Sequence, residues 1–108
     1  MPDTIAAARD AVRALNKAIE ILAAKSAGSL PVSDRDKIDE EMPDLKAQRA
    51  RLQAAINANN AAALKAPTDA QVQAIKSAVT NLEAGTAANL TVTAIINAAS
   101  GAAEVLLT

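Results

Sequence analysis

The longest helical pattern in the chain lies between Ser33 and Leu64. Its large apolar residues recur alternately every four and every three positions, which is the spacing of one face of an α-helix. They are Ile38, Met42, Leu45, Leu52 and Ile56, with Arg49 in the one remaining position of the series. Such a face has to be covered, and both the preceding and the following segment can pack against it.

Alanine and aliphatic residues dominate the composition, and aromatic residues are absent. The chain of 108 residues holds 29 Ala and 26 Ile, Leu, Val or Met residues, but no Phe, Tyr or Trp. Alanine is the strongest helix former, and Leu, Met, Lys, Arg, Glu and Gln follow it closely. We therefore expect an all-α fold with almost no strand. The length suits one domain that spans residues 1–108.

Capping signals and turn residues divide the chain into four predicted helices, which span residues 4–27, 34–64, 69–85 and 92–106. Side chains suited to capping stand at their starts: Asp3 or Thr4, Ser33, Thr68 with Gln71 as a capping box, and Thr91 or Thr93. Gly28 follows the first helix, where a residue in the left-handed conformation is common.

Pro43 interrupts the second predicted helix. Inside a helix, a proline removes one amide donor and clashes with the carbonyl four residues earlier, here that of Asp39, at a cost of about 3 kcal/mol. The apolar spacing stays in phase across Pro43, so we expect one kinked helix rather than two helices. The end of this helix is open between Asn57 and Lys65, because the asparagines favour termination and the alanines after them favour continuation to Leu64.

The first two predicted helices can pair in antiparallel register. Facing apolar residues keep a nearly constant sum of residue numbers, from Ile5 opposite Ile56 to Leu22 opposite Ile38. Together with the short connections between the helices, this favours an antiparallel bundle of four helices. The alternative is a three-helix bundle with a loosely docked C-terminal helix.

Arg49 is the one polar residue in the apolar series of the second helix. A guanidinium that is buried without a partner is costly. We expect its aliphatic stem to pack on Val12 while its charged end reaches water. A second hypothesis is that Arg49 sets the register or the oligomeric state, as polar residues do in coiled coils.

Charged residues form two clusters on the predicted helices. Arg9, Arg13 and Lys17 make a basic stripe that could contact phosphates, but the net charge of −1 and the lack of aromatic residues for base stacking count against nucleic acid. The acidic run between Asp34 and Asp44 lacks the glycine and the ligand spacing of a calcium loop. We therefore expect solvated helix faces and no metal site.

Catalytic and cofactor motifs are not recognisable in the sequence. The chain has no His and no Cys, so it can form neither a hydrolytic triad nor a thiolate metal site. Glycine-rich phosphate-binding motifs are absent as well. We expect a protein that is not an enzyme, with no cofactor and no small-molecule substrate.

Residues 84–103 contain no charged side chain. The segment holds too many Gly, Thr, Asn and Ser residues for a membrane span of ~20 predominantly apolar residues. We therefore expect Ile95 and Ile96 to be buried in the bundle or in a subunit interface. Ile21 lies off the apolar face of the first helix and can face a further helix or a second subunit. These three residues are candidates for interaction.

These patterns favour protein–protein interaction or self-association through an alanine-rich helix face. The alternatives are an amphipathic-helix protein acting at a membrane surface or on an apolar ligand, and a small regulator that contacts nucleic acid through the basic stripe. The lack of Trp and Phe counts against membrane binding. Residues Met1–Thr4 show no basic region followed by an apolar run, so we expect no cleaved signal peptide and a cytoplasmic location. Export without a cleaved signal stays open.

Overall fold

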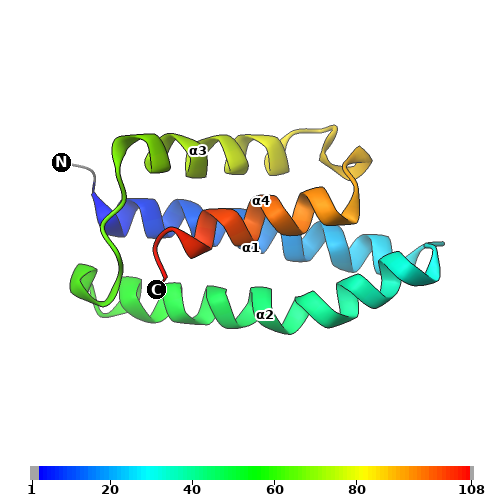
Figure 1. Cartoon of the computed structure of the whole chain (residues 1–108), viewed down its shortest axis with the longest axis horizontal. Helices are drawn as coiled ribbons and strands as arrows, with labels where there is room; N and C mark the ends of the chain where they lie inside the picture. Colours follow the sequence, from blue (N-terminus) through cyan, green and yellow to red (C-terminus); the bar gives the residue numbers. More distant parts are fainter. Residues whose placement is uncertain (1–2, 108) are drawn as a thin grey trace.

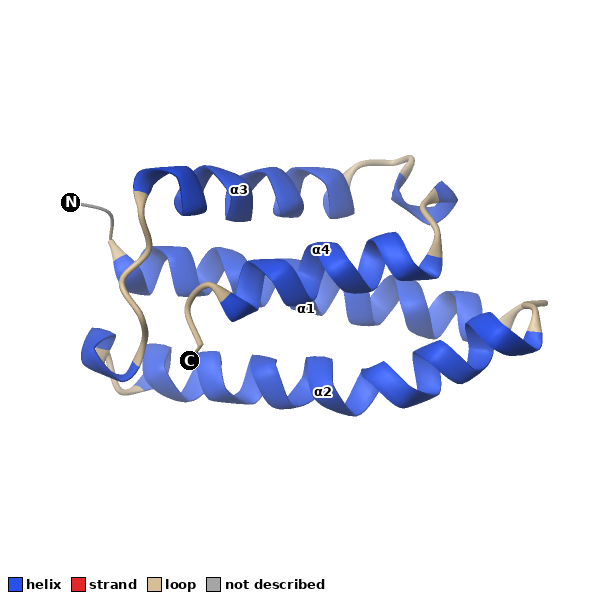
Figure 2. Cartoon of the chain, viewed as in Figure 1, coloured by secondary structure: helices blue, strands red, loops and turns tan. Residues whose placement is uncertain are grey.

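Four α-helices pack against one another, and residues 3–107, which the computed structural model describes, contain no strand (Figure 2). The helices are α1 (Thr4–Ala27), α2 (Val32–Asn57), α3 (Asp69–Glu83) and α4 (Val92–Glu104). Two short 3₁₀ turns, η1 (Ala61–Ala63) and η2 (Ala87–Asn89), lie in the connections. The predicted all-α bundle of four helices is confirmed. Met1, Pro2 and Thr108 lie outside the described residues.

Successive helices run in opposite directions (Figure 1). The four helices do not have equivalent neighbours, as they would in a square arrangement. α1 and α4 form a central pair, and each of them packs against α2 and against α3. α2 and α3 lie on opposite sides of this pair. The segment before residues 33–64 therefore packs against α2 as expected. Of the helices that follow, α4 also packs against α2, whereas α3 packs on the far side of the bundle.

Alanines allow three helices to reach α1 at once. Five alanines of α1 are at most 2% exposed: Ala7, Ala8, Ala11, Ala14 and Ala18. Together with its larger buried residues, they cover roughly half of the helix circumference at 3.6 residues per turn. Since an alanine side chain ends at Cβ, neighbouring backbones can approach closely on each part of this surface. α1 is thus the centre of the fold, although α2 is the longer helix.

The core consists of aliphatic side chains from all four helices. Its largest fully buried members are Leu15, Leu22, Leu45, Leu52, Ile75, Leu82, Ile95 and Leu106. Within residues 3–107 no polar or charged residue is buried. Six residues of α4 are buried in this core, from Val92 to Ala103. The alternative of a loosely docked fourth helix is therefore wrong.

α2 continues through Pro43 without a break, and Figure 1 shows its axis changing direction near the middle. Pro43 and Asp39 are both exposed. The Asp39 carbonyl, which loses its helical partner to the proline, can therefore be hydrated. The prediction of one continuous helix across Pro43 is confirmed.

Of the two ends left open by the sequence, α2 takes the earlier one and stops at Asn57, so the range 34–64 is too long. Asn59 takes a left-handed conformation with φ 49°, the only positive φ among the described residues. The Asn60 amide then donates to the carbonyl of Ala55 at 2.9 Å, and the Asn59 amide donates to that of Ile56 at 3.0 Å. This is a Schellman motif with asparagine in the position that glycine usually takes.

Most of the other caps follow the predictions. Asp3 accepts from the amides at the start of α1, Thr68 and Gln71 form the capping box of α3, and Thr91 caps α4. Ser33 does not cap α2, which already begins at Val32 after Pro31. Gly28 ends α1 with φ −95° and ψ −165°, so the predicted left-handed conformation is wrong there. α3 and α4 each end two residues before the predicted limit.

α3 has a smaller share in the core than α1. It contributes three buried residues, whereas α1 contributes nine. Segments with few buried apolar contacts open locally at a lower free energy than the whole domain. We predict that backbone amides of α3 exchange with deuterium faster than those of α1 in the native protein, which hydrogen exchange followed by NMR can measure. Equal protection of the two helices would contradict this.

Candidate functional site

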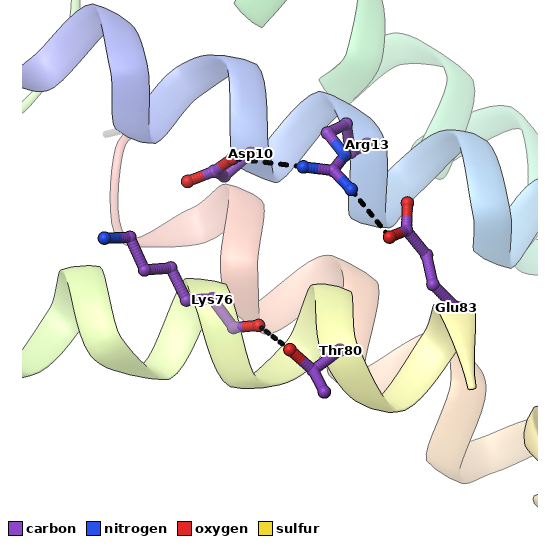
Figure 3. Close-up of polar contacts among 5 residues, drawn as sticks. All are labelled: Asp10, Arg13, Lys76, Thr80 and Glu83. Atoms are coloured by element: carbon purple, nitrogen blue, oxygen red, sulfur yellow. Dashed lines mark hydrogen bonds and ion pairs between the residues drawn. The ribbon is translucent and has the colours of Figure 1, made fainter.

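The predicted basic stripe lies on the solvent side of α1, and ion pairs neutralise much of it. The Arg13 guanidinium donates to Glu83 Oε1 of α3 at 2.7 Å and lies 3.9 Å from Asp10 Oδ1 (Figure 3). The Lys17 Nζ lies 3.3 Å from Glu20 Oε1. Arg9 is exposed and forms no ion pair within residues 3–107. The stripe thus leaves one cation of three unpaired, which is little charge for holding a phosphate backbone.

Figure 3 also shows that the Lys76 ammonium points away from Arg13 and Glu83. The exposed Thr80 hydroxyl donates to the Lys76 backbone carbonyl at 3.0 Å, so this contact stays within α3. Lys76 and Glu83 are seven residues apart and so lie on one side of α3. The Arg13–Glu83 ion pair connects α1 to α3. Both partners are partly exposed, so we expect the pair to add only ~0–1 kcal/mol to stability.

Arg49 is half-buried and donates to Asn16 Oδ1 of α1 at 3.1 Å. Asn16 itself is exposed. The guanidinium thus lies at the edge of the α1–α2 contact, between the buried Leu45 and Leu52 along α2. The exposed hydrogen-bond partner agrees with the expectation that the charged end reaches water. The packing of the stem on Val12 stays a prediction.

The three candidate isoleucines contact the bundle itself. Ile95 is 0% and Ile96 3% exposed, so neither can reach a partner while the bundle is folded. Of the two predicted environments, the interior of the bundle is therefore the right one for them. Ile21 is half-buried and packs against the same core. With Ala88 of η2 it lines a shallow depression, so it faces a segment of its own chain.

A polar contact joins α2 to α4. The half-buried Gln48 donates through Nε2 to Ser100 Oγ at 3.3 Å, and the Ser100 hydroxyl donates to Glu104 Oε1 at 3.0 Å. Gln48, Ser100 and Glu104 line a shallow depression, and Glu41 and Asp44 of the acidic run line it as well. The part of the chain that the structure describes holds no group of three or more acidic, His or Cys side chains arranged for a metal ion.

An uncharged surface lies between α3 and α4. Two depressions of about 420 and 250 Å³ follow each other along the contact of these helices, and they share Asn81 and Ala98. The first is lined by ten residues and the second by six, so fourteen residues line what we call the α3–α4 face. It extends from Gln71 and Val105 at one end to Thr86 and Leu90 at the other.

Small residues form the middle of the α3–α4 face. α3 supplies Ala74, Ser77 and Ala78, and α4 supplies Ala94, Ala98 and Gly101. None of the fourteen lining residues is charged. Ile75 and Ala102 are buried, so twelve of the fourteen residues are at least partly exposed. At the average usage of about 25% charged residues, twelve residues would carry about three charges. Glu83 of α3, which pairs with Arg13 of α1, lies outside this face.

Sequence reasoning found only half of this face. The uncharged run of residues 84–103 indicated α4, but the contribution of α3 was missed. The available signal was that Ala74, Ser77, Ala78 and Asn81 recur at helical spacing without a charge among them. Recognising that this side of α3 meets α4 required the packing of the two helices.

Comparison with protein-family models, with curated proteins and with solved structures gives no match. Among the described residues, no helix combines the length and the hydropathy that crossing a lipid bilayer requires. Function is therefore inferred from the surface of this fold.

Gly101 lies inside α4, where the fold itself gives no reason for a glycine. It is exposed, and a Cβ added there meets no heavy atom within 4 Å. Since glycine costs a helix interior about 1 kcal/mol relative to alanine, we predict that Gly101→Ala raises the melting temperature by about 4–8 °C. Circular dichroism of the dilute protein can measure this. Ala94→Gly, on the same face, should lower it, and a Gly101→Ala variant that melts at or below the wild-type temperature would contradict the prediction.

Proposed function

We propose that this protein is a non-enzymatic helical bundle that binds protein through the α3–α4 face. The observation that carries the proposal is the absence of charge from the fourteen residues that line this face. A surface without charges can be covered by another protein without the free-energy cost of removing ions from water. The interiors of protein interfaces are likewise depleted of charged residues.

The shape of the face supports the same function. Residues 71–83 of α3 extend over roughly 20 Å at 1.5 Å per residue. A shallow groove of that length, lined by small side chains, can accept one face of a partner helix, which is a common mode of protein recognition. The exposed alanines and Gly101 let a partner backbone come close.

The other two candidate functions have less support. The ion pairs of Arg13 and Lys17 reduce the charge available to nucleic acid. A membrane-surface helix uses large apolar residues and cationic side chains on one helix. The α3–α4 face offers mainly small residues and no cation.

The proposal is tested by affinity capture from a lysate of the source cells with three baits. These are the wild-type protein, Ala74→Glu on the α3–α4 face, and Ala50→Glu as the matched control. Ala50 is an exposed alanine inside α2, on the opposite side of the bundle from α3. We expect the wild-type and Ala50→Glu baits to retain the same proteins, and Ala74→Glu to lose them, because a buried unpaired carboxylate is costly. Equal retention by all three baits would contradict the proposal.

A further inference from the structure

We propose that the start of α2 is a conformational device. We name residues 32–42, the part of α2 before Pro43, the acidic segment. This segment unfolds as one unit, up to Pro43, while the other helices stay packed, and its charge sets how often it does so. The device is independent of the proposed function, because α2 lies on the opposite side of the bundle from α3.

Pro43 interrupts the hydrogen bonding of α2 at one end of the acidic segment. Proline has no amide hydrogen, so the Asp39 carbonyl has no helical donor. The axis of α2 changes direction in this region (Figure 1). At the other end, Pro31 stands in the N-cap position and no side chain accepts from the first amides of the helix, so the segment also lacks the cap that stabilises a helix start.

Little buried surface holds the acidic segment against the bundle. Ile38, which is 2% exposed, is its only buried residue. The remainder of α2 has three buried residues, Leu45, Leu52 and Ala55. The first turns of α2 project beyond the end of α4 (Figure 1), and Val32 is 74% exposed. A segment with so few buried contacts opens at a lower free energy than the whole domain.

Unbalanced charge disfavours the folded state of the acidic segment. Its five acidic and two basic residues give a formal charge of −3, in a chain whose net charge is −1. Within residues 3–107, none of these seven residues forms an ion pair, and the Arg35 guanidinium donates instead to the Gly28 carbonyl at 3.0 Å. Asp36, Glu40 and Asp44 follow one another at four-residue spacing, and like charges at this spacing destabilise a helix.

The neighbouring helices do not balance this charge. On α1, the Lys17 Nζ lies 3.3 Å from Glu20 Oε1, and the Lys25 ammonium donates to the Ala88 carbonyl at 2.7 Å. Where α2 meets α4, the charged residues that line the depression are three acids and one base: Glu41, Asp44, Glu104 and Arg51. Since salt screens repulsion between exposed charges, we expect the acidic segment to unfold more often at low ionic strength.

Native-state hydrogen exchange followed by NMR tests the proposal, with each rate taken relative to that of the unfolded chain. We expect amides of residues 36–42 to exchange faster than those of residues 47–55 by a factor of about ten or more, because each large side chain that is not buried lowers protection by roughly that factor. The faster amides should share one weak dependence on urea, as a small unit that opens on its own requires.

Three single substitutions separate the causes. Glu40→Gln removes the middle charge of the three and should slow exchange of the acidic segment by roughly two- to fivefold at low salt, since two repulsive pairs are lost. Loss of a negative charge by itself speeds base-catalysed exchange of nearby amides, so slower exchange reports closure. Glu83→Gln, the same change on α3, is the matched control and should leave these rates unchanged. Pro43→Ala restores a helical donor to the Asp39 carbonyl and should slow exchange of the segment toward that of residues 47–55.

Equal exchange of the two parts of α2 would overturn the proposal, as would an acidic segment with the urea dependence of global unfolding. The charges do not control the opening if exchange of the segment is the same in Glu40→Gln and at about 300 mM salt, where such charges are largely screened, or if Glu83→Gln slows it equally. Unchanged exchange in Pro43→Ala would place the boundary of the unit elsewhere. Each of these results contradicts the proposal, and none depends on a binding partner, so the outcome is separate from that of the capture experiment.

Discussion

The close approach of three helices to the alanine surface of α1 is the contact on which the rest of this structure depends. Ala7, Ala11 and Ala14 are buried although they lie beside the row of large apolar residues. A leucine at any of these places would push a neighbouring helix outward. Because the chain has no aromatic side chain with which to fill a wider gap, the core closes only if the backbones come near. Alanine therefore acts here as a packing residue as well as a helix former.

The central position of α1 and α4 explains where the surface features lie. α2 and α3 cover opposite sides of this pair. α4 therefore has two boundaries, one with α2 and one with α3. On the side of α2, charged and polar residues such as Gln48, Ser100 and Glu104 fill the boundary with α4. On the side of α3, the boundary with α4 is uncharged and lined by small residues. Because the α2–α4 boundary is charged and the α3–α4 boundary is not, the functional proposal concerns the α3–α4 face.

Much of the fold could be predicted because its signals are local. The capping box at Thr68 and Gln71, the cap at Thr91 and the continuity of apolar spacing across Pro43 depend on residues a few positions apart. The end of α2 could not be decided between Asn57 and Lys65 because two local signals compete there. Alanine propensity favours continuation past Asn57, but the Schellman motif at Asn59 satisfies the terminal carbonyls and stops the helix.

What could not be predicted depends on how helices are placed in space. The spacing of Ile38, Leu45 and Leu52 correctly indicated an apolar face on α2, yet it could not show that α1 would take the centre. Likewise, the candidates Ile95 and Ile96 were identified from an uncharged stretch, and only packing distinguishes its buried side from its exposed one. The face that carries the proposed function combines two helices, so no single periodic pattern displays it.

The central claim is that small side chains on α1 are required for helix packing, and one substitution pair tests it directly. Ala14 is fully buried, whereas Ala23 is exposed on the same helix, and leucine has nearly the helix propensity of alanine. Urea unfolding of the two variants should show that Ala14→Leu lowers the free energy of unfolding by about 1–3 kcal/mol through overpacking. Ala23→Leu should stay within about 0.5 kcal/mol of the wild type. If Ala14→Leu were as stable as Ala23→Leu, the bundle would have room at α1, and close packing on its alanines would not be what holds the fold together.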